Sequence, residues 1–303
     1  MRVPEDLRET IEQVHGDRGI EWLAGLPGLL QDCRNRWSLE LDPPFKDLSY
    51  NLVLPGKLSD GKAIVLKLGV PCRELTTECA ALILFDGNGA VRLLEHDSAR
   101  GILLMERVTP GTPLSEVQRE REATTVAAKL MKKLWHVPPA DHLFPSLADW
   151  FLAFTRLRKS FSGGSGAFPH GLITRAEHLF DELNETAPAE ACLVLHGDLH
   201  HANILFSSKE EWLAIDPKGV VGDPGYEVAP FMLNRLPRSA SNAELAKLFN
   251  QRLLIFSEEL RIDKTRLACW AFFHAVLSAL WDWEEGNEPY KTICLAQILE
   301  RLS

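Results

Sequence analysis

The most constraining feature of this chain is the spacing of two aspartates and an asparagine around two short apolar segments. Asp198 and Asn203 lie five residues apart, and Asn203 directly precedes the apolar segment 204–206. Asp216 comes thirteen residues after Asn203 and directly follows a second apolar segment. A further apolar run at 192–195 leads toward the first aspartate and is typical of a buried strand. The sequence therefore predicts a strand that enters a polar loop, and a hairpin that leads from this loop to the second aspartate.

These residue types, in this order, suit phosphoryl transfer. In a kinase site one carboxylate orients the acceptor hydroxyl, while an amide oxygen and a second carboxylate hold magnesium on the nucleotide phosphates. Such chemistry is mostly positioning and charge neutralisation, so the spacing matters more than the number of residues. The fixed His, Gly, Asp and Asn of the loop would recur by chance at roughly one site in 10^5. A polar turn between two strands is the simpler interpretation, but it leaves the paired carboxylates and the amide unexplained.

Composition limits the partners. The 303 residues are 46% hydrophobic and 25% charged, as in ordinary globular proteins. A net charge of -9 repels nucleic-acid phosphates and membrane surfaces but tolerates a cationic substrate. The first residues lack an apolar signal core, and the longest apolar segment, 269–280, is too short to span a bilayer. We therefore expect a cytoplasmic protein with neither a nucleic-acid nor a membrane partner.

The cysteines do not form a metal or disulfide pattern in the sequence. There are six of them, none in a Cys-x-x-Cys pair, and four lie inside apolar runs. We expect all six to be reduced core residues.

The first part of the chain has a strand-rich pattern. After two amphipathic segments, apolar residues alternate with polar ones over 48–54, and 63–68 is a second apolar run. Helical spacing over 74–85 is followed by two short apolar runs, 91–94 and 102–105, which are typical of a hairpin. We expect a sheet with one helix.

After 109–111 the pattern becomes mostly helical. Ser115 and Gln118 have the spacing of a capping box, which predicts the start of a long helix there. The sequence thus predicts an α+β fold with two lobes, which is the protein-kinase architecture. The N-terminal nucleotide-binding lobe, 1–107, would hold a small antiparallel sheet and the first helices, and the lobe 108–303 would be mainly helical.

Lys67 is the candidate for binding nucleotide phosphates. It is a cation inside the apolar run 63–68, where a charge is costly unless it is paired. It resembles the strand lysine that contacts the α and β phosphates in kinases. Glu78, near the middle of the following helix, is the expected partner, in preference to Glu74 one turn earlier. The alternative is an edge-strand lysine that reaches out to solvent.

The segment 103–108 is expected to connect the lobes. The carbonyl of Glu106 and the amide of Val108 would meet the adenine edge, and Met105 would lie just behind the purine. The loop over the phosphates is harder to place, because its candidate, 46–51, contains no glycine. Ser49 and the neighbouring amides could still bind a phosphate, since backbone N–H groups do this in other proteins.

Several stretches of the sequence together carry a resemblance to a known family. They are 87–95, 103–106, 195–203, 206–208, 212–217, 222–227 and 277–281. They resemble the aminoglycoside phosphotransferases, protein-kinase-like enzymes that phosphorylate antibiotic hydroxyls. Within that family they are most similar to the streptomycin 6-kinases, also called aminoglycoside/hydroxyurea resistance kinases.

The resemblance implies a role for each residue of the loop. Asp198 would be the catalytic base or the orienter of the acceptor hydroxyl, and Asn203 and Asp216 would bind Mg²⁺. His196 would brace the loop. His200 would contact the γ-phosphate or the acceptor, although a solvent-exposed loop histidine explains it equally well. ATP would be the co-substrate, and no protein substrate is expected, because the sequence after Asp216 has no activation segment.

The acceptor side is less defined by the sequence. Residues 281–285 combine indole rings with acids, which suits a guanidinium or ammonium ligand, and a solvated helix end is an equal alternative. The candidates there are Asp282, Trp283, Glu284 and Glu285. Glu227 is a further candidate, which could support the loop instead. Three other tryptophans, Trp135, Trp150 and Trp270, are expected in the core.

The resulting expectation is a Mg²⁺- and ATP-dependent kinase of a small cationic acceptor, with streptomycin or a related aminoglycoside as the first candidate. The alternatives are a kinase for an amino alcohol, a sugar derivative or hydroxyurea on the same fold, because acceptor specificity depends on a pocket drawn from several helices. A nucleotide-binding pseudokinase and a helical interaction protein are alternatives from other classes.

Overall fold

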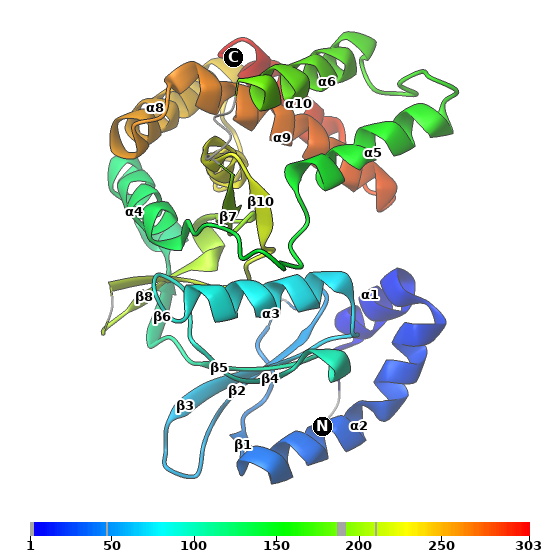
Figure 1. Ribbon diagram of the computed structural model, residues 1–303, viewed down its shortest axis with the longest axis vertical. Coiled ribbons are helices and arrows are strands. Elements are labelled where there is room, and N and C mark those ends of the chain that lie inside the picture. Colours follow the sequence, from blue (N-terminus) through cyan, green and yellow to red (C-terminus); the bar gives the residue numbers. More distant parts are fainter. Residues whose placement is uncertain (1–2, 47, 187–191, 210) are drawn as a thin grey trace. The chain divides into compact units, whose positions relative to one another are not determined.

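The protein consists of two compact units in a computed structural model (Figure 1), which describes residues 3–46, 48–186, 192–209 and 211–303. The units are Met1–Gly111 and Thr112–Ser303. The first contains a sheet with three helices and the second is mainly helical, so the α+β class predicted from the sequence is confirmed.

The first unit is built around one five-stranded antiparallel sheet with the order β1-β2-β3-β5-β4. Its elements, in chain order, are α1 (Glu5–His15), α2 (Asp17–Trp37), β1 (Glu40–Leu41), β2 (Leu52–Lys57), β3 (Ala63–Leu68), α3 (Arg73–Phe85), β4 (Leu93–Asp97), the short 3₁₀ turn η1 (Ser98–Arg100) and β5 (Ile102–Glu106).

Side-chain alternation along β3 divides this unit into two layers. Ile64, Leu66 and Leu68 are buried in one hydrophobic cluster with Leu7 of α1 and Leu26 of α2. Successive residues of a strand point to opposite faces, so the residues between them face away from this cluster. One of those residues is the lysine of the strand, which is therefore directed to the face opposite the α1–α2 cluster.

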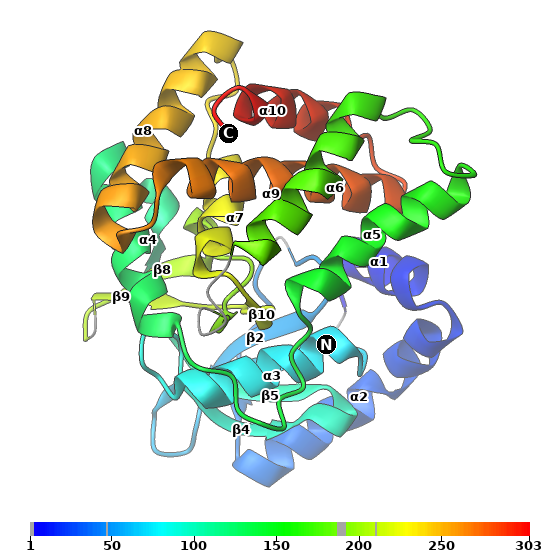
Figure 2. The same cartoon turned by 45° about the horizontal axis from the view of Figure 1, so that its top comes forward.

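The second unit surrounds the long helix α9 (Lys264–Glu284), most of whose residues are buried. Figure 2 shows α9 running among the other helices of this unit. These are α4 (Glu120–Leu134), α5 (Leu147–Ser160), α6 (His170–Glu185), α7 (Val228–Leu233), α8 (Asn242–Leu260) and α10 (Tyr290–Glu300).

Short strands and turns carry the polar loop of this unit. Two small sheets have the orders β10-β7 and β6-β8-β9. The boundary between the two units along the chain falls within β6. The elements are β6 (Pro110–Pro113), η2 (Leu114–Glu116), β7 (Leu193–Leu195), η3 (His201–Asn203), β8 (Ile204–Ser207), β9 (Glu211–Ala214), β10 (Val220–Gly222) and η4 (Pro224–Glu227). The hairpin predicted between Asn203 and Asp216 is the β8–β9 pair.

Some local predictions were wrong. Ser115 lies in a 3₁₀ turn, and the residues that follow it are extended, so the helix α4 begins only at Glu120 and has no side-chain cap. Gln118 donates instead to the carbonyl of Glu116. Complete capping boxes occur at α5, with Ser146, and at α8.

The first strand predicted for the sheet begins later than expected, and several short elements had no prediction, among them β1, β6 and β10. The alternation over 48–54 suggested a strand throughout, but β2 starts at Leu52. The short helix α7 and the 3₁₀ turn η4 before it had no prediction from the hydrophobic pattern, because each is too short to show a period.

All six cysteines are free, and each lies within the described ranges. Cys33, Cys79 and Cys269 are buried, as expected. Cys192, just before the first residue of β7, is exposed, so the expectation of a core position was wrong for it. Cys72 and Cys294, also expected in the core, are only partly buried.

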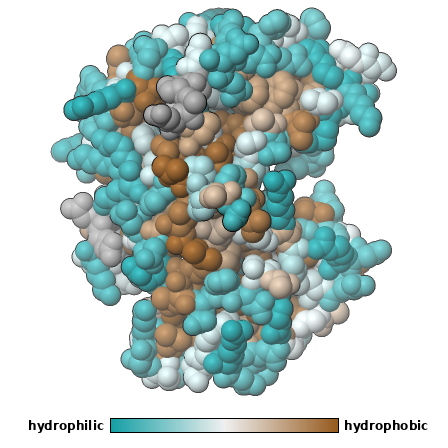
Figure 3. Space-filling model, in the orientation of Figure 1, coloured by the Kyte–Doolittle hydropathy of each residue, from teal (hydrophilic) through white to brown (hydrophobic). Residues whose placement is uncertain are grey.

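The surface of the described residues is mostly hydrophilic on the face shown in Figure 3, with a hydrophobic strip over the sheet of the first unit. Among the helices formed by the described residues, none is both long and apolar enough to cross a membrane.

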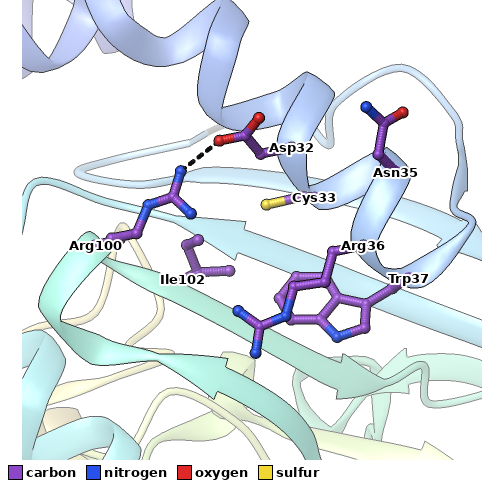
Figure 4. Close-up of a pocket in the computed structure, with 7 residues that line it drawn as sticks. All are labelled: Asp32, Cys33, Asn35, Arg36, Trp37, Arg100 and Ile102. Carbon is purple, nitrogen blue, oxygen red and sulfur yellow. Dashed lines mark hydrogen bonds and ion pairs between the residues drawn. The ribbon is translucent and has the colours of Figure 1, made fainter.

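A surface cavity of about 390 Å³ lies in the first unit, beside the C-terminal part of α2 (Figure 4). Arg100 donates to Asp32 across it, with 2.7 Å between the nitrogen and the oxygen. Arg36 lies 3.9 Å from Asp97 and stacks over the ring of Trp37. Both guanidinium groups are thus neutralised by carboxylates of the same unit.

Candidate active site

The polar loop that follows β7 is held by a buried carboxylate. The backbone N–H groups of His196 and Gly197 donate to the two carboxylate oxygens of Glu227, at 2.7 and 2.9 Å. Glu227 is 0% exposed. Burial raises the pKa of this carboxyl to about 7, against the effect of the two backbone hydrogen bonds, which lower it.

This burial decides between the two roles that the sequence left open for Glu227. Both of its oxygens are used inside the protein, and its side chain has no exposed surface with which to meet an acceptor. The residue supports the loop, and its placement among the acceptor-binding candidates was wrong.

The turn η4, which carries this glutamate, is fastened to the central helix. Asp223 accepts a hydrogen bond from the N–H of Gly225, at 2.6 Å, and forms an ion pair with Arg266 of α9, whose Nε lies 2.7 Å from the carboxylate. The second guanidinium contact joins Nη2 of Arg266 to the same oxygen. A buried carboxylate that caps a turn and pairs with an arginine fixes the position of the next residues.

His196 connects the loop to the end of β9. Its ring Nε2 lies 2.9 Å from the carbonyl oxygen of Ile215, and its Nδ1 accepts from the N–H of Asp198 at 3.2 Å. Burial lowers the pKa of this histidine to about 4, so the ring is neutral at pH 7, and this pairing makes Nε2 the protonated nitrogen. The ring therefore ties the backbone of Asp198 to the residue before Asp216.

Asn203 is oriented by the same loop. Its side-chain Nδ2 donates to the carbonyl of Asp198 at 3.0 Å, and its backbone carbonyl accepts from Ile215 at 2.9 Å. Because the amide nitrogen is used in this way, the amide oxygen is the atom of this side chain that could bind a cation. Asp216 is exposed and has a left-handed backbone, with φ of 57°.

These oxygens fit Mg²⁺. The ion prefers hard oxygen ligands and is held in kinase sites by one or two protein side chains together with water and phosphate oxygens. An amide oxygen and a carboxylate are such a set. Within the described ranges, no group of three or more His, Cys, Asp or Glu side chains is arranged to hold a metal.

The side chain of Asp198 is the most accessible carboxylate of the loop itself. It is 36% exposed, and its Oδ1 lies 3.9 Å from Nε2 of His200. The other ring nitrogen of His200 accepts from the N–H of Ala202 at 3.2 Å, which turns Nε2 toward the carboxylate. Desolvation by the surrounding chain raises the pKa of Asp198, and the charges of His200 and Lys218 act in the opposite direction.

In the first unit, Lys67 and Glu78 form a buried ion pair. Nζ of the lysine lies 2.7 Å from Oε1 of the glutamate, and their side chains are 6% and 8% exposed. Glu74, the other partner considered, is exposed. Burying an ion pair is costly unless its geometry is good, and the short distance on the sheet face away from α1 and α2 satisfies this condition.

The other residues predicted to bind the nucleotide differ in how deeply they are buried. Met105 is buried in β5, and the carboxylate of Glu106 accepts from the backbone N–H of Arg92 at 2.7 Å. Val108 is half-buried and Ser49 is exposed. Asp47, in the same predicted phosphate loop, lies outside the described residues. The adenine and phosphate roles of these residues stay predictions.

The acids at the end of α9 are largely used within the protein. Glu284 forms a two-point ion pair with Arg156, at 2.6 and 2.8 Å, so its charge is already balanced within the protein, and its role as a binder of cations stays a prediction. Asp282 accepts from the hydroxyl of Thr292 at 2.8 Å. Glu285 is exposed, and Trp283 packs beside the ring of Phe161.

The core position expected for two tryptophans was wrong. Trp270 is buried in the core, as expected, but Trp135 and Trp150 are only half-buried, and Trp150 lies against the loop. A Cβ added to Gly197 would lie 2.9 Å from Cη2 of Trp150. Gly197 has a φ of 79°, in the left-handed region that favours glycine. The contact has no sequence signal, because it joins residues 47 positions apart.

Comparison with known proteins was made on the sequence and on the fold. The sequence profile of the family described as aminoglycoside/hydroxyurea antibiotic resistance kinase matches residues 36–286. The match covers both the strand with Lys67 and the loop with Asp198.

The chain belongs to this family.

Its curated relatives agree with this assignment. The streptomycin 6-kinase of Streptomyces griseus is 32% identical over 298 residues, which are 94% of this chain and 92% of that protein. The hydroxyurea phosphotransferase of Kitasatospora aureofaciens is 33% identical over 99% of this chain and 86% of its own length. The resemblance inferred from the motifs is thereby confirmed, and the chain is a small-molecule O-phosphotransferase.

Solved structures support the fold at lower sequence identity. Aminoglycoside phosphotransferase APH(4)-Ia is 12% identical, with a TM-score of 0.62 over 92% of this chain and 99% of that one. Choline kinase LicA from Streptococcus pneumoniae is 14% identical, with a TM-score of 0.59 over 90% of this chain and 99% of that one. The protein-kinase-like fold predicted from the sequence is thus confirmed.

Proposed function

We propose that this kinase transfers the γ-phosphoryl group of ATP, as its Mg²⁺ complex, to a hydroxyl of a small cationic acceptor, with streptomycin or a related aminoglycoside as the first candidate. The observation that carries the proposal is the loop around Asp198. Glu227 and His196 hold its backbone from two sides, and one accessible carboxylate remains at its surface.

Asp198 is proposed to act on the acceptor. Its carboxylate would accept a hydrogen bond from the acceptor hydroxyl and take its proton as the oxygen–phosphorus bond forms and the bond to the leaving ADP breaks. A pKa raised by desolvation makes this carboxylate a better proton acceptor than an ordinary aspartate. Transfer would be direct and in line, without a phosphoenzyme.

Three side chains would position the nucleotide phosphates, two of them through Mg²⁺ and one directly. Asn203 and Asp216 would hold Mg²⁺, which when bound neutralises charge on the phosphates. Lys67 would contact the α and β phosphates, and Glu78 would keep its ammonium group in position. The adenine contacts would come from Met105 and from the backbone groups of the segment that contains it.

The partners follow from this chemistry. The acceptor is proposed to be a small molecule, with ATP drawn from the cytoplasm. No protein, nucleic-acid or membrane partner is proposed, and the net charge of -9 is compatible with a cationic acceptor.

A second acceptor class is favoured by one specific observation. The hydroxyurea phosphotransferase is as similar to this chain, at 33% identity, as the streptomycin 6-kinases are. Hydroxyurea is small and uncharged, so an acceptor pocket shaped for it would not need aromatic faces or acids to meet a cation.

The test is a coupled ADP-release assay with Mg-ATP, run with streptomycin, hydroxyurea, choline, a pentose derivative and no acceptor. Turnover that depends on streptomycin, with a phosphorylated product found by mass spectrometry, supports the proposal. Turnover with hydroxyurea alone moves the assignment to the second class. ATP binding without turnover on any of these acceptors would contradict both.

A further inference from the structure

Four aromatic side chains of the second unit form a closed ring of edge-to-face contacts. Trp150 contacts Tyr226 and Trp281, with ring centroids 5.7 and 5.5 Å apart. His274 closes the ring, at 5.4 Å from Tyr226 and 6.1 Å from Trp281. The interplanar angles lie between 61° and 86°, which is the favoured geometry for aromatic pairs. The four residues are called the aromatic ring cluster below.

Two members of the aromatic ring cluster form its rigid base. Tyr226 is 0% exposed, and its hydroxyl forms a hydrogen bond with Nδ1 of His274 at 2.6 Å. Burial lowers the pKa of His274 to about 3, so the imidazole is neutral and can accept this hydrogen bond at neutral pH. The base is therefore a buried and uncharged pair.

The other two members form a partly accessible rim. Trp150 and Trp281 are each half-buried, unlike Trp270 in the core. Neither indole N–H donates to any side chain or carbonyl in the part of the chain that the structure describes. An indole that is packed among other rings, with part of its surface accessible, can offer that surface to a ligand.

The rim adjoins the proposed catalytic residue. Trp150 contacts Gly197, the residue before Asp198. The carboxylate of Asp198 is also close enough to Tyr226 that its charge helps to raise the pKa of that phenol, after the larger effect of burial. A molecule of two or three rings whose hydroxyl meets Asp198 would thus have its remaining part within reach of the two indoles.

The spacing of the rim is fixed by an ion pair further along the same helices. Trp150 and Arg156 are on α5, while Trp281 and Glu284 are on α9. The two-point pair between Arg156 and Glu284 connects the helices one to two turns beyond the tryptophans. The ion pair would keep the two indoles at a constant separation.

We propose that Trp150 and Trp281 form the wall on which the cationic part of the acceptor binds while its hydroxyl meets Asp198. The inference rests on the proposed function and makes it more specific. Indole is the best of the natural side chains at attracting a cation over its face, and a planar guanidinium can stack on it as well. The wall therefore selects acceptors that carry a guanidinium or ammonium group near the reacting hydroxyl.

The test compares two leucine variants, Trp150→Leu and Trp281→Leu, with Trp37→Leu as the matched control. Trp37 is also half-buried, but it lies at the C-terminal end of α2 in the first unit, under the guanidinium group of Arg36. The measurements are KM for streptomycin, KM for ATP and, by calorimetry, the Kd of streptomycin in the presence of ADP.

Loss of one indole is expected to raise KM and Kd for streptomycin roughly 3- to 30-fold, the equivalent of the usual cation–π energies. The KM for ATP should stay unchanged, and Trp37→Leu should behave as the wild type. The variant Trp281→Phe covers the case in which a leucine variant does not fold. It keeps a ring of weaker attraction, and so should raise the streptomycin Kd by a smaller factor.

The failures of the two proposals are distinguishable. If the wild type phosphorylates streptomycin but the Trp150 and Trp281 variants, Trp281→Phe included, keep its KM and Kd, the wall is refuted and the proposed function stands. Equal increases in the control variant would also refute the wall. If the wild type neither binds nor phosphorylates streptomycin or another cationic aminoglycoside, the proposed function fails and the wall fails with it.

Discussion

The buried carboxylate of Glu227 makes the stability of the protein depend on pH in a way that one substitution removes. Its pKa in the folded protein is raised to about 7, from 4.5 in an exposed chain, chiefly because it is desolvated. A raised pKa means that the folded state holds a proton that the unfolded state has released. The contribution of Glu227 to stability is therefore complete below about pH 4.5 and is lost as the pH rises through about 7.

The size of the effect follows from the same two values. The interval from 4.5 to about 7, at about 1.4 kcal/mol for each pH unit, corresponds to roughly 3 kcal/mol as an upper value. Three buried histidines act in the opposite direction: His196, His201 and His274 have pKa values lowered to about 4, 2 and 3. Below about pH 6.5 these histidines bind protons in the unfolded state but not yet in the folded state, so the protein loses stability as the pH falls.

The variant Glu227→Gln separates these contributions. The amide keeps the shape of the side chain and one acceptor but does not titrate, and the histidines remain in both proteins. The assay is urea unfolding of the wild type and the variant at several pH values between 5 and 8. We expect the stability of the wild type relative to the variant to fall by up to about 3 kcal/mol across this range. Parallel curves for the two proteins would refute the assigned burial of the carboxylate.

Two further substitutions test the supports of the site. Lys67→Met should destabilise the first unit by about 3–5 kcal/mol in urea unfolding, because the buried carboxylate of Glu78 loses the ammonium group that lies 2.7 Å from it, whereas the double variant with Glu78→Leu should recover much of this loss. A cost of the single variant below about 1 kcal/mol would contradict the buried pair. Gly197→Ala should cost about 2–4 kcal/mol, because its φ of 79° disfavours a side chain and the added Cβ would meet Trp150 and Val220 at 2.9 Å. A thermal unfolding midpoint equal to that of the wild type would show that the loop has another conformation.

The elements with strong local patterns were predictable from the sequence. The run 63–68 is β3 to the residue, and helical spacing located α3, so the spacing of Lys67 and Glu78 was enough to expect their pairing. Each of these depends on residues close in the chain. Where two local signals competed, as at Ser115, the pattern of a capping box predicted a helix start that the extended residues after it do not allow.

The parts of the site that could not be predicted depend on contacts between distant residues. Whether Glu227 faces the loop or the solvent depends on how Arg266, 43 residues beyond Asp223, fastens the turn η4. Trp150 and Trp281 meet across 131 positions of sequence, and helical periodicity marks both as apolar without saying which keeps an accessible face. No local pattern contains this information.

The most direct test of the account is the rate of ADP release by the variant Asp198→Asn, with Mg-ATP and the acceptor that the wild type uses best. The amide keeps the size of the side chain and the hydrogen bond from the N–H of Asp198 to His196 but does not take a proton. The account predicts that kcat falls by about 10²–10⁴-fold while the Kd of Mg-ATP, measured by calorimetry, stays that of the wild type. A kcat within a factor of about two of the wild type would contradict the role of Asp198 and with it the proposed mechanism.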